Sequence, residues 1–257
     1  GGIAHDFNNL LQGISGSLQL IERLIDLMVD IQVSHPGFVE VWGCVAASPE
    51  LRALMGAVAV QAVKAIGYEG AGTLEFLLDR AGNFYFMEMN TRLQVEHPVT
   101  EAITGLDLVE LQLRVARGEP LGVRQEDVTF SGHAIEVRLC SEDAAHDFMP
   151  QSGTMARWQM PDGIRVEHAL QSGSEIPPFY DSMIAKVISH GATRDEARGK
   201  LICALEQVTA FGVTTNQGFL IDCLRHPVFA KGEATTAFIG DNRDALLAPR
   251  ADRGSDL

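Results

Sequence analysis

The chain is poor in basic residues and in cysteine. Of its 257 residues, 34 are Asp or Glu and only 20 are Lys or Arg, which gives a formal net charge of -14. Such a surface repels phosphate backbones and anionic lipid, so we expect neither nucleic acid nor a membrane as partner. The four cysteines lie far apart and form no C-x-x-C pair. This spacing argues against the usual zinc and redox motifs and indicates free thiols in a reducing cytosol.

Long apolar runs are missing as well. No stretch reaches the ~18 residues that a membrane-spanning helix needs, and no secretory leader is visible, so we expect a cytoplasmic protein. The sequence also has no glycine-rich phosphate loop, and it begins at Gly1 without Met, as a fragment or a processed chain does. Apolar residues, in contrast, make up 46% of the chain, which is enough for the core of one large domain or two smaller ones.

The first part of the chain changes its periodicity twice. Residues 1–27 carry apolar residues three and four apart, which predicts an amphipathic helix. Over 28–47 this period is lost, and Pro36–Gly37 marks a turn between two short strand-like runs, so we expect a junction here. A second helix is then predicted, because Ser48 suits the N-cap, a proline follows it, and Gly67 suits the position just past the end.

A β-hairpin is predicted next. Two strand candidates, 72–79 and 83–90, are joined by a short connection that ends in Ala81–Gly82. A two-residue loop at that point would place Asp79 opposite Phe84. Beyond the hairpin, the patterns predict a helix over 104–116, short strands over 132–139, 153–159, 163–170 and 183–191, a helix over 193–210 that opens with a Thr193–Glu196 capping box, a helix over 216–225 and a loose polar tail.

The hairpin register brings acidic residues together. It places Glu75 opposite Glu88, where two bare carboxylates would repel each other unless they shared a cation. Every second residue from Glu88 to Glu96 is polar, and alternate residues of an extended chain share a face. Glu75, Glu88 and Asn90 therefore form a candidate magnesium site, Arg92 a candidate clamp for an oxyanion, and Glu96 a candidate general base. The alternative interpretation is an acidic hairpin edge with solvated side chains.

Several longer segments carry a family resemblance. The stretches "GYEGAGTLEFLLD", "FYFMEMNTRLQVEHPVTEAITGLDLVELQLRVARGEPL", "GHAIEVRL" and "PPFYDSMIAKVI" resemble the second half of biotin carboxylase, the ATP-grasp component of acyl-CoA carboxylases. "CSEDAAHDFMPQSGT" is most similar to the methylcrotonyl-CoA and geranyl-CoA type. The resemblance implies an α/β fold, with a partial ATP-grasp lobe over 48–128, a biotin carboxylase C-terminal domain over 129–243 and a flexible tail over 244–257.

The resemblance also implies roles for single residues. Glu75, Glu88 and Asn90 would hold Mg²⁺ or Mn²⁺ on ATP, and Arg92 would orient the reacting anion. The Gln94 side chain would help to hold bicarbonate.

The remaining roles fall on residues further along the chain. The Val95 backbone would complete the bicarbonate site, Glu96 would remove the bicarbonate proton, and Arg138 would stabilise the enolate form of the biotin ureido group. From the residues alone, a surface ion pair is the better interpretation of Arg138. The implied partners are a separate biotin carboxyl carrier domain, a carboxyltransferase subunit and a second copy of the chain in a homodimer.

Parts of the family pattern have no counterpart in the sequence. The N-terminal α/β domain, the glycine-rich lid and the phosphate-binding lysines are not found. In their place, "GGIAHDFNNLLQGISGSLQLIERLI" resembles the H-box helix of sensor histidine kinases, with His5 at the phosphoacceptor position. Two other functions therefore stay open, a phosphoacceptor module that uses His5 and a non-catalytic dimerisation fragment. ATP-dependent carboxylation of free biotin would distinguish the ligase from both.

Overall fold

The computed structural model describes residues 29–35, 38–41, 49–78, 83–235 and 237–248. The chain forms two compact units. The first unit comprises 1–94 and 111–121, and the second comprises 95–110 and 122–257. The helix predicted over 1–27, with His5, lies outside the described residues. Among the described residues, no helix is long and apolar enough to cross a membrane.

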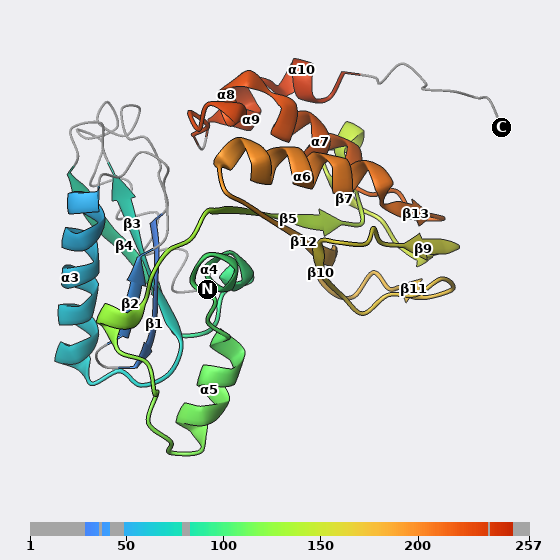
Figure 1. Ribbon diagram of the computed structural model, residues 1–257. Coiled ribbons are helices and arrows are strands. Elements are labelled where there is room, and N and C mark those ends of the chain that lie inside the picture. Colours follow the sequence, from blue (N-terminus) through green and yellow to red (C-terminus); the bar gives the residue numbers. More distant parts are fainter. Residues whose placement is uncertain (1–28, 36–37, 42–48, 79–82, 236, 249–257) are drawn as a thin grey trace, which may run out of the picture. The chain divides into compact units, whose positions relative to one another are not determined.

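The first unit is built on a four-stranded antiparallel sheet in the order β2-β1-β3-β4. The strands are β1 (Val29–His35), β2 (Phe38–Val41), β3 (Gly72–Leu78) and β4 (Phe84–Asn90), and the helix is α3 (Pro49–Ile66). Figure 1 shows α3 in blue beside the sheet. Met55, Ala59 and Val63 of α3 pack with Leu74 and Phe76 of β3 as a buried core.

The predicted junction over 28–47 needs correction. Its two strand-like runs form β1 and β2, and β1 pairs with β3 from Val29 opposite Phe76 to Val33 opposite Gly72. These strands complete the sheet that carries the hairpin, because β3 would otherwise leave its backbone groups on that side unpaired. The sheet of the first unit therefore begins well before residue 48.

The helix of the first unit matches its sequence signals at both described ends. It begins at Pro49, where the missing backbone N–H of proline costs no helical hydrogen bond. It ends before Gly67, whose φ of 62° lies in the left-handed region that glycine adopts without strain. The predicted N-cap, Ser48, lies outside the described residues.

The helix predicted over 104–116 is confirmed as α5 (Leu108–Ala116), which begins later than predicted. A helix that was not predicted, α4 (His97–Thr104), precedes it. Gly105 ends α4 in a left-handed conformation with a φ of 73°. Asp107 then accepts a hydrogen bond from the Glu110 backbone N–H at 2.8 Å, which is the side-chain capping that starts a new helix. The sequence thus carried a stop and a start signal inside the segment predicted as one helix.

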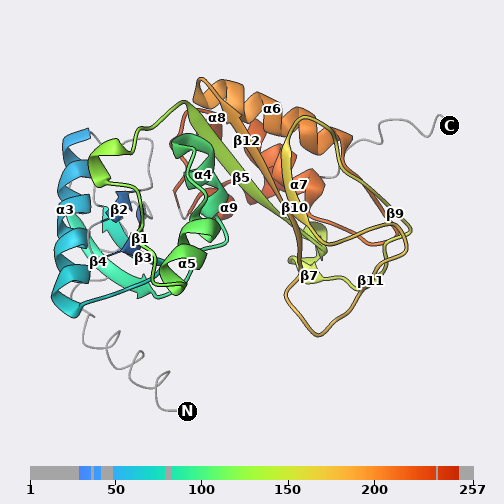
Figure 2. The same ribbon diagram turned by 60° about the horizontal axis from the view of Figure 1, so that its bottom comes forward.

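The second unit is layered around a three-stranded antiparallel sheet in the order β10-β12-β5. The strands are β5 (His133–Cys140), β10 (Arg165–His168) and β12 (Met183–Gly191). Helix α6 (Arg194–Gln207) packs on β5 and β12 from one side, and α4 packs on the same two strands from the other, as Figures 1 and 2 show. The core between the sheet and α6 is apolar and includes Ile135 and Val187.

Many of the smaller elements of the second unit were not predicted. The smaller elements are η1 (Gln125–Asp127), β6 (Glu142–Asp143), η2 (Ala144–His146), β7 (Met149–Pro150), β8 (Gly153–Thr154), β9 (Arg157–Gln159), β11 (Glu175–Ile176), β13 (Thr209–Phe211), α7 (Gln217–Arg225), α8 (Pro227–Ala230), α9 (Phe238–Asp241) and α10 (Arg243–Leu246). The strand predicted over 153–159 is divided into β8 and β9, which belong to different sheets. Helix α6 stops before 210 because β13 follows it and pairs with β9. The predicted tail over 244–257 begins instead with part of α10, whose Leu246 is buried.

Candidate functional site

The β3–β4 hairpin places the two predicted carboxylates opposite each other. Glu75 faces Glu88 in the register, as the sequence predicts. The register shifts by one residue between Glu75 and Phe76, so Leu78 rather than Asp79 lies opposite Phe84. This bulge corrects the predicted pairing at the loop end, because one extra residue on β4 changes every pair beyond it. The loop over 79–82 lies outside the described residues.

An amide joins the two carboxylates. The Asn90 Nδ2 donates to Glu75 Oε1 at 2.7 Å and to Glu88 Oε1 at 3.0 Å. Glu75 is only 3% exposed, whereas Glu88 is exposed. The positive end of the Asn90 amide therefore offsets the repulsion between two facing carboxylates. Two carboxylates and an amide are hard oxygen donors, and this donor set fits Mg²⁺ or Mn²⁺.

The predicted alternation beyond Asn90 holds only in part. Strand β4 ends at Asn90, so Arg92, Gln94 and Glu96 do not continue an extended face. Gln94 nevertheless turns back to the cluster, since it is 8% exposed and its Nε2 lies 3.3 Å from Glu75 Oε1. Arg92 is exposed and donates to Gln94 Oε1 at 2.7 Å. Arg92 is thus connected to the carboxylate cluster through Gln94.

Glu96 belongs to the second unit and to a different element. It is the N-cap residue of α4, with a φ of -82° and a ψ of 5°, and Pro98 follows in the first helical turn. Its carboxylate forms an ion pair with Arg138 of β5, with Arg138 Nη2 2.9 Å from Glu96 Oε2. This pair joins the candidate base to the residue that the family resemblance makes the enolate-stabilising cation. It is also the partly exposed ion pair that the residues alone predicted for Arg138. Both side chains are partly exposed, and so are open to a substrate.

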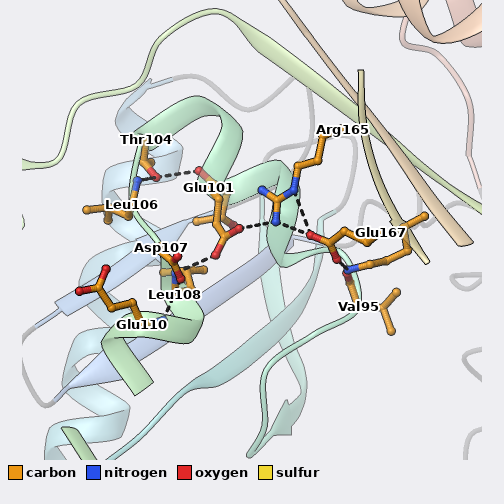
Figure 3. Close-up of polar contacts among 11 residues, drawn as sticks. Val95, Glu101, Thr104, Leu106, Asp107, Leu108, Glu110, Arg165 and Glu167 are labelled. Carbon is orange, nitrogen blue, oxygen red and sulfur yellow. Dashed lines mark hydrogen bonds and ion pairs between the residues drawn. The ribbon is translucent and has the colours of Figure 1, made fainter. Parts of the chain in front are cut away.

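A charged network on the same side of the sheet was not predicted from the sequence. Arg165 of β10 donates to Glu101 of α4 at 2.7 Å and also pairs with Glu167 (Figure 3). The other Glu101 oxygen accepts from the Leu108 backbone N–H at 2.7 Å. Arg165 and Glu101 thereby tie α4 to the sheet. Only the alternation of charge in "IRVEH" hinted at this role.

One group of three residues has the geometry of a cation site. His97, Glu101 and Glu167 offer ligand atoms that all lie within 4.8 Å of one another. Both carboxylates of the group already bind the Arg165 guanidinium. We therefore interpret the group as part of the ion-pair network.

Burial changes the acidity of two carboxyl groups on this face of the sheet. The pKa of Glu136 is raised to about 8, first by burial, and Lys186 nearby opposes the rise. Burial also acts to raise the pKa of Glu167, but hydrogen bonds from Lys186 and Arg165 outweigh it and hold that pKa below its ordinary value. Burial therefore favours the protonated form of Glu136, while the two cations favour the ionised form of Glu167.

Comparison with known protein families gives two matches. Residues 136–241 match the family "Biotin carboxylase C-terminal domain", and residues 26–124 match "Carbamoyl-phosphate synthase L chain, ATP binding domain". The second match begins at residue 26 and so includes β1 and β2, in agreement with the sheet described above.

Curated relatives and solved structures resemble the chain over most of its length. Biotin carboxylase 2 of Bacillus subtilis is 49% identical over 84% of this chain and 49% of the relative. The mitochondrial methylcrotonoyl-CoA carboxylase subunit alpha of Dictyostelium discoideum is 43% identical over 91% of this chain and 34% of the relative. The biotin carboxylase domain dimer of Hydrogenobacter thermophilus 2-oxoglutarate carboxylase, solved with MgADP, ADP and bicarbonate, has 39% identity and a TM-score of 0.83, over 88% of this chain and 54% of that one. The chain thus spans about half, or less, of the relatives it matches.

Proposed function

We propose that this chain, which carries an ATP-grasp lobe followed by a biotin carboxylase C-terminal domain, contributes part of the active site for the ATP- and bicarbonate-dependent carboxylation of biotin. The observation that carries the proposal is the convergence of the Glu75 and Glu88 carboxylates on Asn90. Glu75 is buried and faces Glu88 across the hairpin, which presents two carboxylates to one cation and differs from a fully solvated hairpin edge. This geometry favours the ligase over the two alternative functions.

In this proposal the residues of the first unit bind and orient the substrates. Glu75, Glu88 and Asn90 would hold the divalent cation, which would supply positive charge to offset the negative charge of the ATP phosphates during phosphoryl transfer. Arg92 provides the charge that orients the reacting anion. Gln94 presents its amide to bicarbonate. The Gln94 contacts with Glu75 and Arg92 fix the position of that amide.

The residues of the second unit handle the proton and the developing charge. The Glu96 carboxylate takes the bicarbonate proton, and the bicarbonate oxygen then attacks the γ-phosphorus, with ADP as leaving group and carboxyphosphate as product. Carboxyphosphate breaks down to carbon dioxide and phosphate beside biotin, the released phosphate takes the ureido N–H proton, and the resulting anion forms the N–C bond to carbon dioxide. Arg138 stabilises the negative charge on the biotin ureido oxygen, and its pairing with Glu96 keeps it in place before substrates arrive.

We propose further that the parent enzyme is of the methylcrotonyl-CoA or geranyl-CoA type, which "CSEDAAHDFMPQSGT" supports. Biotin would arrive on a separate carrier domain, the carboxyl group would pass on to a carboxyltransferase subunit, and two copies of the enzyme would form a homodimer. The relatives serve several carboxylases, among them a 2-oxoglutarate carboxylase and a methylcrotonoyl-CoA carboxylase.

Complementation tests the proposed reaction. The full chain is mixed with the amino-terminal half of Biotin carboxylase 2 from Bacillus subtilis, and ADP release is measured with free biotin, with and without bicarbonate. We expect bicarbonate-dependent turnover from the pair that neither part shows alone. Glu88→Gln and Glu96→Gln should each abolish it, whereas Glu69→Gln, at an exposed site on the same unit as Glu88, should not. Absence of turnover from two folded partners, or turnover that survives both substitutions, contradicts the proposal.

A further inference from the structure

Lys186 of β12 is a buried ammonium group with two defined partners. Its side chain is 11% exposed, its Nζ donates to the Val95 backbone carbonyl at 2.8 Å, and it lies 2.6 Å from Glu167 Oε2. A buried cation is costly unless it is paired and fully hydrogen-bonded. Glu167 supplies the charge and Val95 a further acceptor, so the ammonium group is held in one place.

Lys186 and Arg138 are two neighbouring cations on this face of the sheet, and each has its own partner. Lys186 lies directly opposite Arg138 in the β12–β5 pair, where like charges repel. Each of the two cations binds one of two successive residues, Val95 and Glu96, in the segment that leads into α4. Arg138 binds the Glu96 carboxylate, and Lys186 binds the Val95 carbonyl. The segment that leads into α4 is therefore held by two neighbouring strands at once.

The contact with Val95 also fixes a peptide plane. The Val95 carbonyl and the Glu96 N–H belong to one planar trans peptide, so a carbonyl held by Lys186 directs that N–H the opposite way. On the far side of Glu96, its own carbonyl accepts from the Val99 N–H at 3.0 Å in the first turn of α4. Both peptide planes that flank Glu96 are thus determined, one by Lys186 and one by the helix.

We propose that Lys186 is a positioning residue for the base, because it fixes the Val95–Glu96 peptide and so sets where the Glu96 carboxylate and the backbone at Val95 lie. This inference rests on the proposed function, in which Glu96 takes the bicarbonate proton and Val95 binds bicarbonate. Lys186 acts through these two residues and does not touch the substrate. Glu167 supports it from the next strand, where it faces Lys186 in the β10–β12 pair.

The test uses the full chain labelled with ¹³C and ¹⁵N. Lys186→Met should move the Val95 carbonyl carbon signal upfield and accelerate exchange of the Val99 amide about tenfold, the effect expected for loss of one hydrogen bond to a charged group. Lys186→Arg should restore most of both signals, because the guanidinium keeps the charge. Lys200→Met is the matched control, since Lys200 pairs with Glu196 on α6 and not with α4.

Bicarbonate titration separates this inference from the proposed function. In the unsubstituted chain, bicarbonate should shift the Val95 and Glu96 amides, and Lys186→Met should weaken that response about tenfold while Lys200→Met leaves it unchanged. If bicarbonate shifts neither amide in the unsubstituted chain, the proposed function is at fault, and the carbonyl and exchange signals still decide the role of Lys186.

Two results would overturn the inference. One is a Val95 carbonyl signal and a Val99 exchange rate that stay unchanged in Lys186→Met. The other concerns Glu167→Gln, which keeps the lysine but removes its ion-pair partner and serves if Lys186→Met does not fold. This variant should shift the Val95 carbonyl signal in the same direction, and an unchanged signal in a folded Glu167→Gln chain is contrary to the inference.

Discussion

Glu136 is a largely buried carboxyl group that lies among several charged side chains. Its Oε2 is buried without a hydrogen-bond partner, and Lys186, Glu96, Glu167 and Arg138 act on it from the sheet and from the start of α4. A carboxyl group that loses water without gaining a partner favours its neutral form. A neutral Glu136 also avoids repulsion with the nearby Glu96 carboxylate.

Protonation of Glu136 predicts a pH dependence of stability. The pKa of its side chain is raised from 4.5 to about 8 on folding. Between these values the folded state binds the proton and the unfolded state does not, so stability should fall as pH rises through this window. Glu136→Gln should remove that slope and stabilise the protein by roughly 4 kcal/mol at pH 8 relative to the unsubstituted chain, since a rise in pKa from 4.5 to about 8 corresponds to ~1.4 kcal/mol per pKa unit.

The measurement is urea unfolding between pH 5 and pH 8.5. Trp158 fluorescence in a Trp42→Phe background reports the unfolding of the second unit. Glu233→Gln, at an exposed carboxylate of the same unit, should leave the slope in place. A Glu136→Gln chain whose stability still falls over this pH range as the unsubstituted chain does would show that another group carries the proton.

Glu75 and Glu88 predict a metal site that can be seen without ATP. We expect Mn²⁺ to bind weakly and to broaden NMR signals around both residues, because two facing carboxylates gain from a shared cation. Glu88→Gln should reduce the broadening, and Glu69→Gln, at an exposed site on the same unit, should not. Broadening around His97 and Glu101 with none at the hairpin would move the metal site to the other acidic group.

At the scale of elements, the second unit depends on close backbone contacts at a few glycines. Gly212 follows β13 with a φ of 102°, and a Cβ there would lie 2.7 Å from the Ala156 backbone nitrogen. Gly163, in the turn before β10, has a φ of 76° and open space around it. Both positions therefore require a positive φ, but only at Gly212 would an added Cβ collide with neighbouring backbone atoms.

The pair of glycines predicts two different costs. Gly163→Ala should destabilise the second unit by about 1 kcal/mol, which is the penalty for a side chain in the left-handed region. Gly212→Ala should cost about 1–3 kcal/mol more, because β13 must move away from β9 to make room. Both values can be read from urea unfolding followed at Trp158. Equal losses in the two variants would mean that the Ala156 contact relaxes freely.

Sequence patterns predicted most elements but placed some ends wrongly. The strand over 183–191 and the helix over 217–225 follow their hydrophobic patterns closely, and Thr193 caps α6 by accepting from the Glu196 N–H. Helix α4 was missed because the polar alternation that precedes it, from Glu88 to Glu96, was interpreted as extended chain. The left-handed Gly105 ends α4, and the Asp107 side chain caps the start of α5, so these two residues set the helix ends rather than the apolar periodicity.

At the scale of the whole molecule, the predicted fold class is confirmed. The chain is a mixed α/β protein with an ATP-grasp lobe and a biotin carboxylase C-terminal domain. The candidate residues are divided between the two units, with Glu75, Glu88 and Asn90 in the first and Val95, Glu96 and Arg138 in the second. The chain passes from one unit to the other three times, after residues 94, 110 and 121.

The isolated chain should show little or no turnover. Phosphoryl transfer depends on cationic groups and backbone N–H groups that bind the phosphates. The sequence offers only four lysines and no glycine-rich loop for this purpose. Two of these lysines are engaged elsewhere, Lys186 with Glu167 and Lys200 with Glu196. We expect no bicarbonate-dependent ADP release with free biotin. Clear turnover that Glu88→Gln abolishes would show that this part of the site suffices.

The sequence by itself determined the carboxylate pair and the order of the elements. Strand alternation is local, and it places Glu75 and Glu88 on the two strands of one hairpin. That they lie opposite each other depends on the bulge between Glu75 and Phe76, because the pairing at the loop end is one residue away from the register that the predicted turn gives. Where Glu96 lies could not be predicted in this way, because the strand ends at Asn90 and a proline starts a helix instead. Its pairing with Arg138 spans 42 residues, and the Lys186–Val95 contact spans 91. Only the packing of α4 on the β5–β12 face brings such distant residues together, since local patterns carry no information about which elements will touch.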